Sequence, residues 1–199
     1  MVVNELAKIY CLVGKSCSGK DTIYERLLAE DKHIIPLITY TTRPIRLHET
    51  NGKEYYFVND TTFQTMLKKG NIIEYREYDT VHGKWYYFTA KDGQIDISSR
   101  KKYITINTLS GAKKLIEQYG RNVVVIHLFV NDETRIFRMI GREINGEKDF
   151  AEMCRRFLAD TEDFSMDKFK ELNVPVNHIE NINLVECTKT IKEIMRRIK

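Results

Sequence analysis

Residues 14–22 read GKSCSGKDT, and the spacing of their glycines and lysine suits the binding of phosphate groups. Gly14, Gly19 and Lys20 match the phosphate-loop pattern G-x-x-x-x-G-K-[ST], in which glycines admit close backbone approach and the lysine reaches the terminal phosphates. Successive backbone N–H groups form an anion nest there, and the following helix N-terminus adds positive potential. Asp21 stands at the hydroxyl position and offers a carboxylate oxygen, which Mg²⁺ also accepts. We therefore predict a nucleotide-binding loop with Asp21 as metal ligand and with these contacting residues: Gly14, Lys15, Ser16, Cys17, Ser18, Gly19, Lys20, Asp21 and Thr22.

A buried strand, a glycine turn and a helix must hold such a loop in place. Residues 8–13 are typical of the strand, and residues 21–30 carry apolar side chains at the spacing of one helix face. The run VVVIHLFV at 123–130 is typical of a buried parallel strand. We place this strand at 122–130 and expect further strands at 36–39, 71–78, 84–89, 102–107 and 174–179. We expect further helices at 60–69, 110–119, from 132 onward, at 150–164 and at 184–198.

Composition narrows the class of protein. The chain has 199 residues, of which 42% are hydrophobic and 30% charged, so we expect a folded core. The net charge is only +4. No stripe of basic and aromatic residues indicates nucleic-acid binding, and no run of about 18 apolar residues indicates a membrane span. We find no secretion signal, and the four dispersed cysteines predict neither a zinc site nor disulfides, so we expect one domain in the cytoplasm.

Two motifs after the loop resemble the guanylate kinase family. Residues 41–46 read TTRPIR and residues 51–57 read NGKEYYF, in the pattern T-T-R-x-x-R followed by G-K-[DE]-Y-x-F. The similarity continues through residues 72–74, 85–89, 138–142 and 155–156, so it covers most of the chain. The resemblance implies an α/β fold with a three-layer parallel sheet core at about 1–39 and 90–199. It also implies an α/β insert for the nucleoside monophosphate at about 40–89 and a small lid at about 141–149.

The resemblance implies that ATP, with Mg²⁺, donates its γ-phosphoryl group to GMP or dGMP, giving ADP and GDP or dGDP. It assigns the GMP phosphate to Arg43, Arg46, Tyr55 and Tyr87, and the guanine edge to Thr39, Glu74 and Thr89, with Asn107 as a further candidate at the base. It assigns catalytic roles to Lys20, Arg43, Arg138, Arg142 and Arg156. Its implied partners are these small molecules, in a monomer or homodimer, with no nucleic acid and no membrane.

Residue chemistry agrees with this assignment. Arg43 and Arg46, three apart on a proline-stiffened segment, can fork onto one phosphate dianion. Glu74 can accept from the N1–H and 2-amino groups of guanine, whereas adenine would leave it poorly paired at a cost of about 1–3 kcal/mol. The plainer interpretations are solvated loop charges for the two arginines, a surface carboxylate for Glu74, and a solvated helix face for Arg138 and Arg142.

The sequence departs from the family pattern in three places. Asp21 replaces the loop hydroxyl, Thr105 and Asn107 stand where the family has acidic residues near a strand end, and the segment 74–89 is longer. We hypothesise that Asp21 compensates for the missing strand carboxylate. Two alternatives remain open: a kinase similar to the ribose 1,5-bisphosphate kinases, which can carry Asp after the loop lysine, and a non-catalytic guanylate-kinase-like binding module.

Overall fold

Five parallel strands form the central sheet of the computed structural model, which describes residues 8–80, 83–145 and 149–198. Their spatial order is β2-β7-β1-β8-β9. The strands are β1 (Lys8–Val13), β2 (Ile34–Pro36), β7 (Lys102–Ile106), β8 (Val123–Phe129) and β9 (Val176–Glu180). Ile9 to Val13 are fully buried, which explains why β1 is a continuous apolar run rather than an alternating one.

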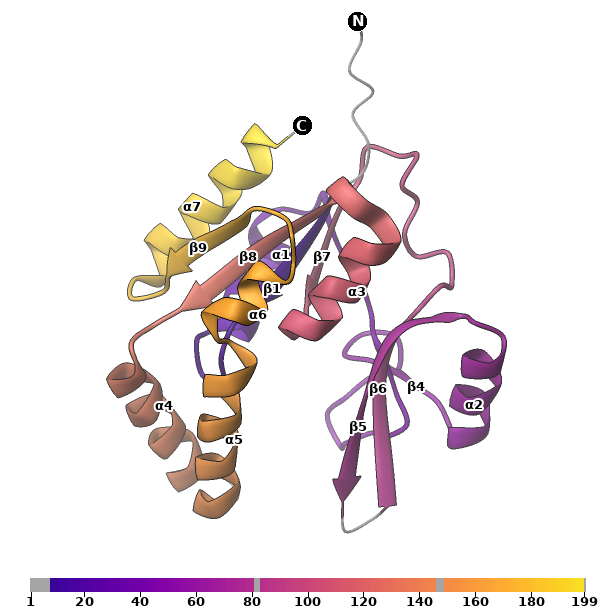
Figure 1. The fold of residues 1–199 in the computed structure, drawn as a ribbon, viewed down its shortest axis with the longest axis horizontal. Coiled ribbons are helices and arrows are strands. Elements are labelled where there is room, and N and C mark those ends of the chain that lie inside the picture. The colour runs from indigo at the N-terminus through magenta and orange to yellow at the C-terminus, as the bar shows by residue number, and fades with distance from the viewer. Residues whose placement is uncertain (1–7, 81–82, 146–148, 199) are drawn as a thin grey trace, which may run out of the picture.

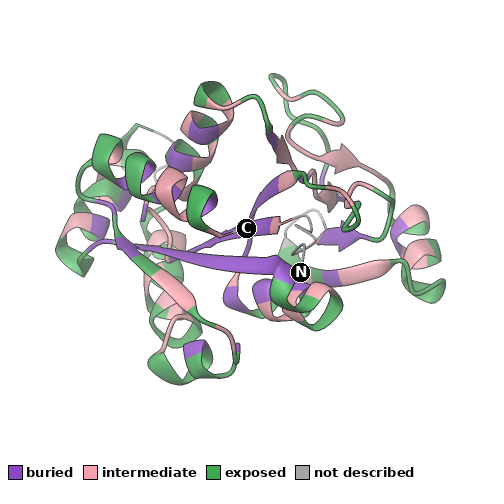
Figure 2. Ribbon diagram, turned by 90° about the horizontal axis from the view of Figure 1, so that it is seen from above, coloured by how far each residue is buried: buried purple, intermediate pink, exposed green. Residues whose placement is uncertain are grey.

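Helices cover both faces of this sheet, as the buried strands between exposed helix surfaces in Figure 2 show. One face packs on α1 (Lys20–Glu30) and α7 (Leu184–Arg197), through side chains such as Ile23, Leu27 and Ile191. The other packs on α3 (Leu109–Tyr119) and α6 (Met166–Lys170), through Leu115 and Phe169. The predicted three-layer α/β core is therefore confirmed.

A second, four-stranded sheet has the order β4-β3-β6-β5. It comprises β3 (Tyr40–Thr41), β4 (Tyr56–Phe57), β5 (Ile72–Thr80) and β6 (Gly83–Ala90). The helix α2 (Asp60–Lys68) begins after Asn59, whose side chain accepts from the Thr62 N–H at 2.8 Å. Phe63 of α2 stacks on Tyr86 of β6 with ring centroids 4.0 Å apart, so a small aromatic core joins the helix to this sheet.

Two further helices, α4 (Asp132–Ile144) and α5 (Phe150–Asp163), pack against each other. Asn131 caps α4 by accepting from the Thr134 N–H at 2.8 Å. A short 3-10 turn, η1 (Gly120–Asn122), joins α3 to β8. In Figure 1 the α4–α5 pair and the second sheet both lie beyond the carboxyl ends of the central strands, one on each side.

Most predicted elements are confirmed within a few residues, but the second strand, expected at 36–39, lies at Ile34–Pro36. Residues 37–39 are irregular and separate β2 from β3. The side chain of Gln94 holds both backbone groups of Ile38, accepting from its N–H at 2.9 Å and donating to its carbonyl at 3.0 Å, so an amide replaces a neighbouring strand. The helix α6 was not expected from the sequence.

The segment expected as a lid, 141–149, begins inside a helix. Gly141 to Ile144 form the last turn of α4, and Asp149 caps α5 by accepting from the Glu152 N–H at 3.0 Å. Residues 146–148 lie outside the described residues. Within the part of the chain that the structure describes, no helix has the length and apolar character needed to cross a membrane.

Candidate active site

The loop from Gly14 to Gly19 joins β1 to α1 and depends on glycine at both ends. Gly14 has φ 157° and Gly19 has φ 89°. A Cβ atom on Gly14 would lie 2.2 Å from the Leu128 carbonyl oxygen, and one on Gly19 would lie 2.3 Å from Nδ2 of Asn181. Other residues would clash with these neighbours, so the tight path of the loop requires glycine.

The backbone of this loop presents unoccupied donors. The N–H groups of Cys17 and of residues 19–22 donate to no acceptor among the described residues, whereas that of Ser18 donates to the Lys15 carbonyl at 3.2 Å. The first N–H groups of a helix have no partner within the helix. Together with the positive potential at the start of α1, they form a site suited to a phosphate group.

Lys20 and Asp21 bring opposite charges to the start of α1. Nζ of Lys20 donates to the carbonyl oxygens of Gly14 at 2.7 Å and Lys15 at 3.0 Å. Burial lowers the pKa of Lys20, an effect that the nearby carboxylates of Asp21 and Asp160 oppose. The lysine therefore lies folded along the loop, next to the free N–H groups.

Asp21 is available to a cation. Its side chain is exposed and takes no hydrogen bond from the residues described. Burial raises the pKa of Tyr55, which directly precedes β4, and the charge of Asp21 makes a smaller contribution in the same direction. No group of three or more metal-ligating side chains occurs in the described parts of the chain. One carboxylate, completed by nucleotide phosphates and water, nevertheless fits the usual surroundings of Mg²⁺.

Glu74, Thr89 and Asn107 form one buried polar cluster. They are 6%, 6% and 3% exposed. Thr89 Oγ1 donates to Glu74 Oε1 at 2.7 Å, and Asn107 Nδ2 donates to the same oxygen at 3.2 Å. Glu74 and Thr89 are neighbours across β5 and β6, while Asn107 follows β7 of the central sheet. The structure thus brings three of the residues expected at the base together, and Glu74 is not a surface carboxylate.

Arg43 is held by a partner that the sequence analysis did not single out. Its Nη1 and Nη2 donate to the two carboxylate oxygens of Glu49 at 2.9 and 2.7 Å, and the Arg46 N–H donates to Glu49 at 2.8 Å. The guanidinium is 4% exposed and lies against the rings of Tyr55 and Phe57, 5.6 and 5.4 Å from their centroids. Arg43 is therefore a fixed charge, whereas the side chain of Arg46 is exposed.

The other acceptor-side candidates lie on the second sheet or directly before one of its strands. Tyr87 contacts Tyr55 edge to face, with centroids 5.6 Å apart, and pairs with Thr41 across β3 and β6. Thr39 is half-buried, and its carbonyl oxygen accepts from the Tyr56 N–H at 2.9 Å. Tyr87 and Tyr55 accordingly lie close to Arg43, as the assignment of a common phosphate to all three requires.

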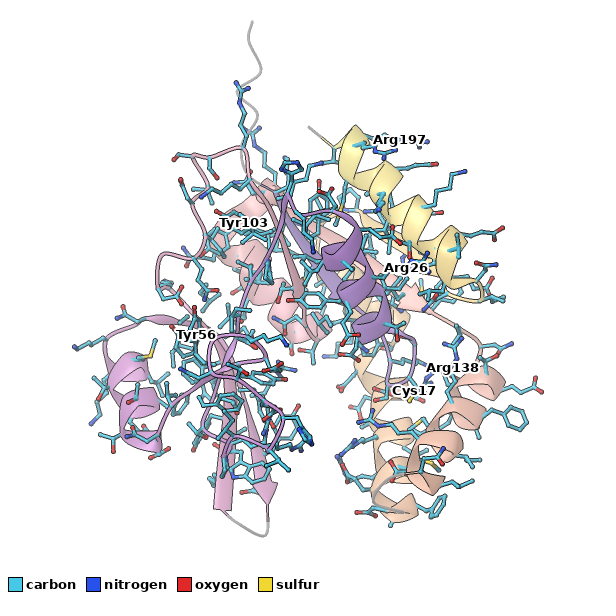
Figure 3. The ribbon with its side chains drawn as sticks, turned by 180° about the vertical axis from the view of Figure 1, so that it is seen from behind. Cys17, Arg26, Tyr56, Tyr103, Arg138 and Arg197 are labelled. Atoms are coloured by element: carbon cyan, nitrogen blue, oxygen red, sulfur yellow. The ribbon has the colours of Figure 1, made fainter. Side chains whose placement is uncertain are left out.

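The three arginines expected from the lid side differ in position. Arg138 of α4 reaches the loop, where it donates to the carbonyl oxygens of Cys17 and Asn181, both at 3.3 Å, and Figure 3 shows it beside Cys17. Arg156 is exposed and donates to Glu152 of its own helix at 2.7 Å. Arg142 is exposed in the last turn of α4. Of these three arginines, Arg138 is therefore the one that contacts the phosphate loop in the described structure.

Sequence reasoning missed several residues that shape the loop. Asn181, after β9, donates from Nδ2 to the Ser18 carbonyl at 2.9 Å, and Arg135 of α4 donates to the Ser16 carbonyl at 3.1 Å. Neither lies in a motif. One feature of the sequence could have indicated that Arg135 is buried: it lies four residues before Met139, on the helix face that packs into the fold.

Two surface pockets lie away from the phosphate loop. One of about 440 Å³ lies between α2 and β6 beside Asp60 and Lys84, and one of about 250 Å³ lies between α1 and α7 beside Arg26 and Lys192. Neither is lined by a residue of the phosphate loop. The loop site is identified by its donors and charges rather than by its depth.

Comparisons with known proteins agree on one family. A family model described as guanylate kinase matches residues 6–82. A guanylate kinase of Clostridioides difficile strain 630 is 30% identical over 157 residues, covering 78% of this chain and 73% of the relative. One of Nitrosomonas europaea is 26% identical, covering 95% and 94%. The crystal structure of guanylate kinase from Anaplasma phagocytophilum superimposes with a TM-score of 0.68 at 22% identity, covering 97% of this chain and 86% of that one, a likeness in fold.

Proposed function

The chain belongs to the guanylate kinase family, and from that premise we infer that it is an enzyme that transfers the γ-phosphoryl group of ATP to GMP or dGMP. The products are ADP and GDP or dGDP. The buried carboxylate of Glu74, beside Thr89 and Asn107, is the observation in this structure that best supports guanine as the acceptor base. Its oxygen Oε2 takes no hydrogen bond from the described residues and is free to accept from guanine N1–H and the 2-amino group.

We assign the donor side to the phosphate loop. The free N–H groups of residues 19–22 and the ammonium of Lys20 would hold the ATP phosphates. Arg138, already at the loop, would add positive charge where the transferring oxygens gain negative charge. Arg142 and Arg156 would have to change position to join it, since both are exposed here.

We assign the acceptor phosphate to Arg43, Arg46, Tyr55 and Tyr87. Arg43 and the two tyrosines are already grouped, and the exposed side chain of Arg46 is free to turn toward a dianion. Transfer between two phosphates needs positioning and charge stabilisation rather than a general base. The second sheet would then be the acceptor-binding unit, and α4–α5 the unit that brings arginines to the reacting phosphates.

Mg²⁺ would be held by Asp21 and would neutralise charge on the bound phosphates. An Asp21→Ser variant tests this role. We expect lower activity and a weaker dependence of ATP binding on Mg²⁺, measured by titration calorimetry with and without the metal. Asp31→Ser, beyond the far end of the same helix, is the control. An Asp21→Ser protein with parental kinetics and metal response would show that the carboxylate charge of Asp21 is not needed to hold the metal.

One assay tests the activity itself. ADP release from ATP and Mg²⁺ would be followed with GMP, dGMP, AMP, CMP, UMP and ribose 1,5-bisphosphate as acceptors. Turnover confined to GMP and dGMP is expected. Turnover only with the sugar phosphate would move the assignment to that kinase type, and ATP binding without any turnover would indicate a binding module.

We propose a cytoplasmic enzyme, supported by four free cysteines, and a monomer or homodimer that acts on small molecules without nucleic acid or membrane. Size-exclusion chromatography with light scattering would give the oligomeric state.

A further inference from the structure

Arg135 is a fully buried arginine in a helix that is otherwise largely exposed. Its side chain is 0% exposed, and the guanidinium carbon lies 4.7 Å from the ring centroid of Phe157 on α5. Nη1 donates to Asp132 at 2.6 Å, and Nη2 donates to Asp160 at 2.7 Å. A buried guanidinium is tolerated only when it is paired and hydrogen-bonded, and here two carboxylates meet that need.

The same ion pair holds one residue of the phosphate loop, Ser16, through both of its backbone polar groups. Nε of Arg135 donates to the Ser16 carbonyl oxygen at 3.1 Å, and the Ser16 N–H donates to Oδ2 of Asp160 at 2.8 Å. Both backbone polar groups of Ser16 are therefore taken by side chains, one from α4 and one from α5. These helices follow the loop by more than a hundred residues, so the contact is purely tertiary.

We propose that Arg135 and Asp160 are positioning residues that fasten the phosphate loop to the α4–α5 pair and so set the loop for ATP. By holding Ser16 from outside, they leave the N–H groups of Cys17 and residues 19–22 to the phosphates. Among residues 14–22, Ser16 is the one whose backbone N–H donates to a side chain, and that side chain is Asp160.

The contacts of Arg135 and Asp160 with Ser16, which we call the clamp, also position Arg138, a candidate catalytic residue. Arg138 follows Arg135 by three residues on α4, so both project toward the same side of that helix. Arg138 contacts the Cys17 carbonyl, next to the clamped Ser16. Any movement of α4 against the loop would break the Arg135 contacts. The clamp therefore keeps Arg138 in a fixed position relative to the loop.

The plainer interpretation is that the ion pair only stabilises the fold. A variant of Asp160 and a control variant separate the two interpretations. The KM measurements rest on the proposed function, whereas the binding measurements do not. Asp160→Asn keeps the shape of the side chain and removes the charge that both donors share. Asp163→Asn, one turn further on the exposed side of α5, is the matched control.

We expect Asp160→Asn to bind a non-hydrolysable ATP analogue about tenfold more weakly, the effect of weakening charge-assisted hydrogen bonds, while its KM for GMP changes less than about twofold. Asp163→Asn should match the parent in both. Parental affinity of a folded Asp160→Asn protein for the analogue would overturn the proposal.

The double variant Arg135→Leu/Asp160→Leu gives a second readout. Replacing a buried ion pair with apolar residues often preserves stability, so its Tm should return toward that of the parent. Its affinity for the analogue should stay low, because Ser16 is no longer held. Recovery of both Tm and affinity would overturn the proposal. Calorimetry needs no turnover. If the parent does not turn over GMP but the parent and variants show the expected affinities for the ATP analogue, the proposed function is refuted and the role of Arg135 and Asp160 is not.

Discussion

Glu74 is a buried carboxylate with one oxygen occupied and one oxygen available. Thr89 and Asn107 donate to Oε1, and the nearest cation to Oε2 is Nε of Arg76 at 3.9 Å. If Oε2 accepts from guanine, a neutral amide at this position should pair less selectively. We expect Glu74→Gln to lower the ratio of kcat/KM for GMP over AMP about 10- to 100-fold, corresponding to roughly 1–3 kcal/mol.

The measurement is the ADP-release assay with both acceptors. Glu77→Gln is the matched control, because Glu77 lies on the same strand and pairs with the exposed Lys84. An unchanged ratio in a folded Glu74→Gln enzyme would mean that the base is recognised elsewhere.

Glu49 makes the stability of the acceptor-side loop depend on pH. Its hydrogen bonds to Arg43 hold the pKa of Glu49 at about 2, below its ordinary value. Because this folded-state pKa is depressed, the contribution to stability is present above the unfolded-state value, near pH 4.5, and is lost as the pH falls toward 2.

We expect Glu49→Gln to lower the free energy of unfolding by about 1–3 kcal/mol at pH 7, and the difference from the parent to shrink between pH 5 and pH 3. Urea unfolding measures both. Glu117→Gln, which removes an exposed pair with Lys114, should cost no more than about 1 kcal/mol. A difference for Glu49→Gln that stays constant down to pH 3 would contradict the assignment.

At the scale of elements, the start of α3 fixes Asn107. A Cβ atom on Gly111, in the first turn of that helix, would lie 2.0 Å from Oδ1 of Asn107. Asn107 could not keep its place, and its bond to Glu74 would be lost. We expect Gly111→Ala to raise KM for GMP and to destabilise the fold by about 1–3 kcal/mol.

Gly141 of α4 offers a matched control. No atom lies within 4 Å of a Cβ built there, so Gly141→Ala should stabilise the helix by up to about 1 kcal/mol and leave KM for GMP unchanged. Thermal unfolding and acceptor kinetics of the two alanine variants provide the comparison. Equal effects at the two glycines would show that the α3 contact has no role in the site.

Local patterns predict the elements better than the contacts between them. We could predict β1, β8 and the start of α2 because the residues that determine them, two apolar runs and a helix cap, lie within or next to each element. The irregular segment at 37–39 was not, since Gln94, far along the chain, supplies its hydrogen bonds. The motifs located the loop, Arg43 and Glu74, whereas Glu49, Arg135 and Asp160 acquire their roles only through tertiary contacts.

At the scale of the whole molecule, the candidate residues are divided among three parts. The phosphate loop follows β1 of the central sheet, Glu74 lies on β5 of the second sheet with Arg43 just after β3, and Arg138, Arg142 and Arg156 belong to α4–α5. Figure 1 shows the last two parts on opposite sides beyond the ends of the central strands. Phosphoryl transfer needs donor and acceptor at about 3–3.5 Å, with water excluded. We therefore expect the second sheet and α4–α5 to approach each other when both substrates are bound.

We expect a bisubstrate analogue, adenosine and guanosine joined by a polyphosphate chain, to reduce the radius of gyration toward the ~16 Å of a compact chain of this length. Small-angle X-ray scattering measures it. The matched control joins two adenosines, which should engage the phosphate loop but leave Glu74 unpaired and so produce less closure. ATP alone should have little effect on the radius, because the loop is already fastened to α4–α5 and the main movement that remains is that of the second sheet. A radius unchanged by the guanosine analogue, at saturation confirmed by calorimetry, would show that catalysis proceeds without this approach of the second sheet.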